Sequence, residues 1–225
     1  VRRNLDVNIT IFNNQIYGLT KGQYSPTTKF GQITKTSPYG TIDYPFNPAE
    51  LIMGAQGTFY ARALDVNPKL TTDIMLQAAE HYGTSVVEVL QNCVIFNDKT
   101  HAAITDREVR DDKTILLEHG KPMIFGKNRD KGIRFNGTSL EVVTLGENGI
   151  TEKDLLVHDE TTEDTGIHMM LAQMKGDFPV AIGVIRSVKK GVYTQMFEEQ
   201  MEEVKAASKY KCVDDLLNSG DTWEI

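Results

Sequence analysis

A short polar segment near the start of the chain combines residue types that can bind a cation and an anion. A buried apolar strand is predicted over residues 7–12, and it runs into the paired amides Asn13 and Asn14. Amide oxygens and the free carbonyl of Ile16 are neutral ligands that Mg²⁺ accepts, and Lys21 is a point charge suited to phosphate or carboxylate. Because α/β sheets bind ligands at the carboxyl ends of their strands, the segment predicts a ligand site. The same residues would also suit an ordinary turn.

The elements around this segment alternate between helix and strand patterns. Residues 47–50 combine an amide N-cap, a proline in the first turn and a glutamate three residues on, which predicts a helix start. Residues 58–63 alternate like a strand, residues 68–82 have helical periodicity, and residues 85–90 return as a strand. This order predicts an α/β domain over residues 1–97, with a mostly parallel sheet flanked by helices.

The rest of the chain, residues 98–225, has a different pattern, and we expect a C-terminal extension of short strands and helices that contacts other subunits. Asn136-Gly137 is a hairpin turn signal, and residues 178–186 predict a strand. Residues 195–208 predict an acidic amphipathic helix whose apolar stripe could dock on a partner subunit.

Other polar stretches are predicted to cover a site or to face solvent. Residues 22–46 form a long loop, and a loop of that length in a compact domain is usually functional or disordered. We expect it to cover a ligand or to contact a partner. His101 lies among irregularly spaced acids, which favours a solvated helix or loop over a metal site, and His158 lies in an acidic stretch that we expect at the surface.

Composition excludes some classes of function. The net charge of −7 argues against a nucleic-acid surface, which needs basic patches. No apolar run reaches the ~20 residues of a membrane span. Two cysteines do not make a disulfide framework, so the expected setting is the reducing cytoplasm.

Cys93 ends an apolar stretch that predicts a buried strand and its exit. From the residues alone, a small buried side chain is the favoured interpretation of this cysteine. Cys212 lies among charged residues near the end of the sequence and is interpreted as a plain thiol.

The sequence of residues 13–23 and 25–28 resembles the corresponding motif in the β subunit of the 2-oxoacid:ferredoxin oxidoreductases, and the 2-oxoglutarate (KorB-type) branch is nearest. In that family the second amide of the pair and the carbonyl two residues on bind the Mg²⁺ that grips thiamine diphosphate. The resemblance therefore implies a thiamine-diphosphate-binding domain in which Asn14 and the carbonyl of Ile16 hold Mg²⁺.

The same resemblance implies roles for further residues. Positions facing the diphosphate in the family correspond to Gly18, Leu19 and Thr20, and a position that recognises the anionic substrate or coenzyme A corresponds to Lys21. It also implies that Cys93, which lies well downstream of the amide pair, is the distant ligand of a 4Fe-4S cluster. Such clusters need four thiolates but not four adjacent ones.

The sequence departs from the family at its start. Neither the Gly-Asp-Gly of the cofactor motif nor the paired cluster cysteines of the family occur in it. We therefore expect a C-terminal portion of a β subunit that needs the upstream segment as a partner and is inactive alone.

The implied activity is oxidative decarboxylation of a 2-oxoacid, with 2-oxoglutarate preferred, to acyl-CoA and CO₂. Electrons would pass through the cluster to ferredoxin, and an α subunit would complete the substrate side. Three alternatives stay open: pyruvate as the substrate, a non-redox thiamine-dependent decarboxylase with Cys93 merely buried, and a non-enzymatic assembly subunit.

Overall fold

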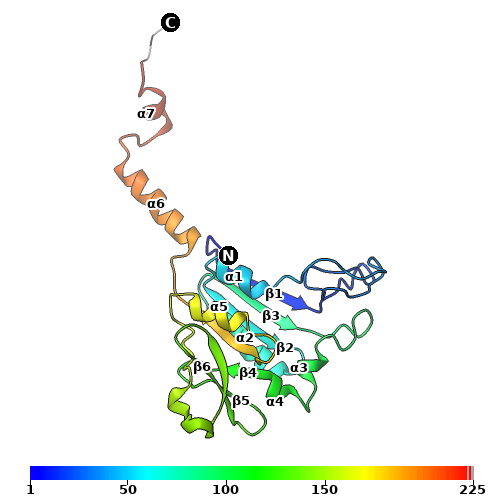
Figure 1. The fold of residues 1–225 in the computed structure, drawn as a ribbon. Helices are drawn as coiled ribbons and strands as arrows, with labels where there is room; N and C mark the ends of the chain where they lie inside the picture. Colours follow the sequence, from blue (N-terminus) through cyan, green and yellow to red (C-terminus); the bar gives the residue numbers. More distant parts are fainter. Residues whose placement is uncertain (222, 224–225) are drawn as a thin grey trace.

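The computed structural model describes residues 1–221 and 223 and contains two β-sheets with helices packed around them (Figure 1). The strands are β1 Val7–Asn13, β2 Phe59–Leu64, β3 Thr84–Leu90, β4 Thr114–Leu117, β5 Ile124–Phe125, β6 Lys131–Phe135, β7 Leu140–Thr144 and β8 Val180–Ser187. The α-helices are α1 Pro48–Gly54, α2 Pro68–Glu80, α3 Ala102–Thr105, α4 Arg110–Lys113, α5 Gly166–Ala172, α6 Tyr193–Ala207 and α7 Val213–Leu217. Two short 3₁₀ helices are η1 Glu147–Gly149 and η2 Glu152–Asp154.

The main sheet has five strands in the order β1-β3-β2-β8-β4. Both β1 and β2 run parallel to β3, β8 is antiparallel to β2, and β4 is parallel to β8. The predicted mostly parallel sheet is therefore confirmed. Two of its five strands, β4 and β8, come from residues 98–225, so this part of the chain contributes to the same sheet as residues 1–97.

Helices cover both faces of this sheet. On one face α2 packs Ile74 and Ala78 against β2 and β3. On the other face α1 and α5 lie beside each other, and the core there also includes Phe125 and Ile133 from the small sheet. The helix α1 begins as the sequence predicts, because the side chain of Asn47 accepts a hydrogen bond from the amide of Ala49.

The strand β1 is present as predicted, but the expectation that it is buried is wrong. It lies at the edge of the sheet and pairs with β3 alone among the described strands. Most of its side chains are consequently exposed, including Val7, Ile9 and Phe12. Only its last residue, Asn13, is buried.

The small sheet has three antiparallel strands in the order β5-β6-β7. The predicted hairpin at Asn136-Gly137 joins β6 to β7, where the Asn136 side chain accepts hydrogen bonds from the amides of Thr138 and Ser139. This turn chemistry is local, which is why the sequence reveals it.

A buried arginine ties the acidic stretch before α5 to β8. The Arg186 guanidinium donates to the carbonyls of Gly57, Thr162 and Glu163 and to Nδ1 of His168. His158 is also buried, and its Nε2 contacts the carbonyl of Val184 on β8 at 2.8 Å. The prediction that His158 lies at the surface is therefore wrong, because a neighbouring strand supplies the partner that its own acidic segment lacks.

Beyond β8 the chain leaves the sheet and forms an arm of α6 and α7 that extends away from the body (Figure 1). The predicted acidic amphipathic helix is α6, and all of its residues are exposed, including the apolar stripe Phe197, Met201 and Val204. Within residues 1–221 and 223, no helix has the length and apolar character needed to cross a bilayer.

Candidate functional site

The paired amides lie where β1 ends, and the structure gives them different tasks. Asn13 is buried; its Nδ2 donates to Glu88 at 2.7 Å, and its Oδ1 accepts from the Thr27 hydroxyl at 2.7 Å. Both ends of the Asn13 amide are therefore hydrogen-bonded within the fold, and the side chain is buried. Asn14 is only half-buried, and its Oδ1 accepts a single hydrogen bond, from the amide of Ile16 at 3.2 Å. Since an amide oxygen has two lone pairs, Asn14 keeps one for a ligand.

The backbone between the two predicted metal ligands is turned sharply. Gln15 has φ 55°, the left-handed region that non-glycine residues seldom occupy. Its carbonyl accepts the hydroxyl of Thr28 at 2.7 Å, which helps to hold the turn. Ile16 is buried, yet no described residue donates a hydrogen bond to its carbonyl. The turn thus leaves two neutral oxygens, Asn14 Oδ1 and Ile16 C=O, with free acceptor capacity, and this donor set fits Mg²⁺.

A small hollow of about 280 Å³ lies beside these oxygens. Its lining combines Phe12, Asn14 and Ile16 with Thr27 and Phe46 from the loop that follows. The long loop 22–46 therefore borders the site, and no helix or strand is found within it.

The next predicted residues form a tight exposed tip. Tyr17 and Gln23 pair as an isolated antiparallel bridge, and Gly18, Leu19, Thr20 and Lys21 lie between them. Leu19 is 98% exposed, and no described residue contacts the Lys21 ammonium group by a hydrogen bond or an ion pair. The structure brings Asn14 and Ile16 together but leaves this tip facing outward, so its contact with a ligand stays a prediction.

Cys93 follows β3 at the carboxyl end of the parallel strands, the same end at which Asn13 and Asn14 lie. The parallel register places Asn13 beside Leu90, so the chain leaves both strands at neighbouring points. Cys93 is half-buried with a free thiol, and its backbone pairs with that of Asn97. In the described part of the chain, no group of three or more His, Cys, Asp or Glu side chains is placed to hold a metal ion, so Cys93 can supply one ligand of a cluster and not the set.

A buried ion pair between Arg62 and Glu88 supports Asn13, and few features of the sequence indicate it. Glu88 on β3 accepts hydrogen bonds from Tyr60 at 2.5 Å, from Arg62 Nε at 2.8 Å and from Asn13. Burial alone would raise the pKa of the Glu88 carboxyl, but the Arg62 charge and these donors outweigh burial and lower the pKa. The only indication of this ion pair in the sequence is that Glu88 is the single acid within the apolar residues 86–90.

His101 supports the same point of the backbone. It is buried, and its Nε2 lies 2.8 Å from the carbonyl of Asn13, which can only accept, so Nε2 carries the proton. Burial lowers the pKa of His101. The expectation of a solvated residue is therefore wrong, because the partner of His101 lies 88 residues earlier in the chain.

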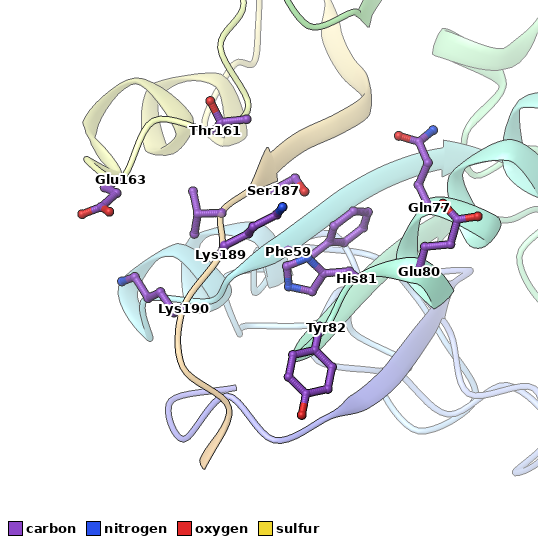
Figure 2. Close-up of a pocket in the computed structure, with 11 residues that line it drawn as sticks. Phe59, Gln77, Glu80, His81, Tyr82, Thr161, Glu163, Ser187, Lys189 and Lys190 are labelled. Atoms are coloured by element: carbon purple, nitrogen blue, oxygen red, sulfur yellow. The ribbon is translucent and has the colours of Figure 1, made fainter. Parts of the chain in front are cut away.

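A cavity of about 810 Å³ lies at the other end of the parallel strands, where β2 and β3 begin (Figure 2). It is bordered by Phe59 at the start of β2, by His81 and Tyr82 just before β3, and by Lys189 and Lys190 beyond β8. Both signs of charge occur in its wall, because Glu80 and Glu163 also line it. It shares no residue with the hollow beside Asn14.

The chain is similar to known thiamine pyrophosphate enzymes. Residues 1–89 match the family model described as thiamine pyrophosphate enzyme, C-terminal TPP binding domain. Among curated proteins, the 2-oxoglutarate oxidoreductase subunit KorB of Mycobacterium tuberculosis is 37% identical over 230 residues, covering all of this chain and 61% of that protein. The 2-oxoglutarate synthase subunit KorB of Archaeoglobus fulgidus is 42% identical over 155 residues, covering 69% of this chain and 51% of that protein.

A solved structure has the same fold. The 2-oxoglutarate:ferredoxin oxidoreductase from Magnetococcus marinus, with 2-oxoglutarate, coenzyme A and succinyl-CoA bound, aligns with a TM-score of 0.68 and 23% identity over 98% of this chain and 60% of its own. The resemblance to KorB-type β subunits is therefore confirmed, and residues 1–89 resemble the C-terminal domain of thiamine pyrophosphate enzymes. The chain spans about half to three-fifths of the length of these relatives.

Proposed function

We propose that this KorB-like chain is part of the β subunit of a 2-oxoglutarate:ferredoxin oxidoreductase, an enzyme that forms succinyl-CoA and CO₂ and reduces ferredoxin. One observation carries the proposal. Within the segment that matches a thiamine pyrophosphate enzyme family, Asn14 Oδ1 and the Ile16 carbonyl both retain acceptor capacity at the carboxyl end of a strand. The curated relatives named for 2-oxoglutarate favour that substrate over pyruvate.

In this proposal the chain holds its cofactors by neutral oxygens and by one sulfur. Asn14 and Ile16 bind Mg²⁺, while Gly18, Leu19 and Thr20 face the diphosphate. Thiamine diphosphate supplies an electron sink for decarboxylation, and a 4Fe-4S cluster accepts single electrons. The thiolate of Cys93 holds the cluster near the carboxyl ends of β1 and β3.

Lys21 contributes an anion contact in the same proposal. It lies at the tip of an exposed loop and has no described partner that would compete for its charge. A mobile ammonium group suits the distal carboxylate of 2-oxoglutarate or a phosphate of coenzyme A. The Magnetococcus enzyme binds both ligands, which supports this choice of anions.

The proposed partners are an α subunit, the upstream segment of the β subunit and ferredoxin, in the cytoplasm. Apolar side chains are unusually exposed on the loops at the site's edge, namely Leu19, Ile33, Tyr39, Ile42, Tyr44, Val94 and Ile95. Monomeric proteins rarely expose apolar patches of this kind. We infer that the α subunit covers this edge, and that the stripe on α6 gives a second contact.

Metal-dependent cofactor binding tests the proposal. Asn14→Ala in the enzyme as isolated, with its partner chains, removes one of the two ligands proposed for this chain and should raise the Mg²⁺ concentration for half-maximal thiamine diphosphate binding by at least about tenfold. Asn92→Ala is the matched control: its side chain contacts Asp98 and Lys99 and not the metal loop. Equal Mg²⁺ requirements in the two variants would remove the metal assignment.

Iron content separates the redox proposal from a non-redox decarboxylase. Cys93→Ala should remove the visible absorption of the cluster and most iron and acid-labile sulfide, whereas Cys212→Ala on the arm should leave all three unchanged. A wild-type enzyme without iron would favour the non-redox decarboxylase. A fully assembled sample that binds thiamine diphosphate but turns over no 2-oxoacid would favour the assembly subunit.

A further inference from the structure

One residue, Asn97, contacts both of the proposed cofactor sites. Asn97 lies in the loop after β3, and its Nδ2 donates to the carbonyl of Asn14 at 2.9 Å and to that of Gln15 at 3.4 Å. Its own backbone amide donates to the carbonyl of Cys93 at 2.9 Å. Asn97 therefore contacts the backbone of the proposed metal ligand and the backbone of the proposed cluster ligand.

The orientation of Asn97 is itself fixed. Its Oδ1 accepts a hydrogen bond from Nε2 of Gln32 at 2.9 Å. The carbonyls of Asn14 and Gln15 can only accept, so the nitrogen of the Asn97 amide faces them and its oxygen faces Gln32. The donor end has no other acceptor among the described residues.

Neighbouring residues extend the link along the metal loop. The hydroxyl of Thr100 donates to Oε1 of Gln15 at 2.8 Å, and His101 donates to the carbonyl of Asn13. Residues 97–101 thus hold three successive residues of the turn, from Asn13 to Gln15. A left-handed residue such as Gln15 persists only where its surroundings determine it in this way.

We propose that Asn97 is a positioning residue that sets the spacing between the Mg²⁺ ligand Asn14 and the cluster ligand Cys93. The inference rests on the proposed function and adds a residue that neither binds a cofactor nor touches substrate. A displacement of the Asn14 backbone is transmitted to the Cys93 backbone, and the reverse, through the side chain and the main-chain amide of Asn97. Supporting contacts of this kind hold functional groups within a fraction of an ångström.

Two measurements on the enzyme as isolated, with its partner chains, test the inference. The first is the Mg²⁺ concentration for half-maximal thiamine diphosphate binding, which Asn97→Ala should raise about 3- to 10-fold, the effect of losing one hydrogen bond. The second replaces Mg²⁺ with Mn²⁺ and records the relaxation enhancement of the reduced cluster by electron paramagnetic resonance, which depends on the distance between the two centres. Asn97→Ala should change this enhancement, and Asn92→Ala in the same loop should match the wild type in both measurements.

Each outcome decides the matter. If Asn97→Ala behaves like Asn92→Ala in both measurements, Asn97 has no positioning role. A shift in the Mg²⁺ requirement with an unchanged enhancement overturns the link, because Asn97 would then support the metal loop alone. If Asn97→Ala does not fold, Gln32→Leu removes only the support of Asn97 Oδ1 and should shift the Mg²⁺ requirement about 2- to 3-fold. A wild-type enzyme that lacks iron, or binds thiamine diphosphate without Mg²⁺, refutes the proposed function before any Asn97 variant is made.

Discussion

Three buried histidines should make the folded chain sensitive to mild acid. His101, His158 and His168 are each at most 7% exposed, and each has Nε2 within 2.9 Å of a main-chain carbonyl. Nε2 therefore holds the proton of the neutral ring, and a second proton would go to Nδ1. That atom faces the Arg186 guanidinium in His168 and has no partner among the described residues in His158. Burial is the largest cause of the lowered pKa of all three rings.

The direction in which stability changes with pH follows from the lowered pKa of these three rings. Below the ordinary pKa of about 6.5, the unfolded chain binds protons that the folded chain excludes, so stability falls as the pH falls. Between pH 6.5 and 5.5 each fully excluded proton costs about 1 kcal/mol. The three rings together should cost at most about 3 kcal/mol, the limit reached if the folded chain excludes all three protons, out of a typical total of about 5–15 kcal/mol.

The assay is urea unfolding followed by far-ultraviolet circular dichroism at pH 6.5 and 5.5. Tryptophan fluorescence would not serve, because the sole tryptophan, Trp223, is 82% exposed at the end of the arm. His158→Gln should reduce the loss between the two pH values by about a third. Equal unfolding free energies of the wild type at the two pH values would refute the reasoning.

Three further predictions concern stability and substrate. Arg62→Met leaves the Glu88 carboxylate buried without its ion pair and should cost about 3–5 kcal/mol in urea unfolding, whereas the double change Arg62→Met with Glu88→Leu should cost much less; equal costs would contradict the pairing argument. Gly83→Ala should lower the unfolding free energy by about 1–3 kcal/mol, since φ is 128° there and a Cβ would lie 2.5 Å from Oδ1 of Asn4; an unchanged denaturation midpoint would argue against this. Lys21→Ala should raise the KM for 2-oxoglutarate more than the dissociation constant of thiamine diphosphate, and steady-state kinetics showing equal changes would count against the anion contact.

The sequence predicted the elements whose signals are local. The start of α1 at its asparagine cap, the β6-β7 hairpin and the strands β2 and β3 follow from residues that lie next to one another. The exposure of β1 did not follow, because an apolar run does not reveal whether its strand lies at the edge of a sheet. Residue types also suggested Asn14 and Ile16, and the structure places their oxygens in one turn.

The parts that the sequence missed depend on distant partners. Glu88 and Arg62 are 26 residues apart, and His101 reaches a carbonyl 88 residues earlier. His158 lies among acids that suggested solvent, but its partner is a carbonyl on β8. Since the folded backbone alone brings such pairs together, spacing along the chain gives no signal for them.

The position of β8 between β2 and β4 has a consequence for how the chain folds during synthesis. The strand β4 pairs with β8, and residues 118–179 must be made before that partner begins to emerge. Synthesis proceeds at about 5–20 residues per second, so β4 lacks its partner strand for roughly 3–12 seconds while these 62 residues are made. During that interval β2 also lacks its second neighbour, and its apolar edge is open to association with other nascent chains. The ribosome-bound intermediate is thus the stage at which a chaperone would bind this protein most strongly.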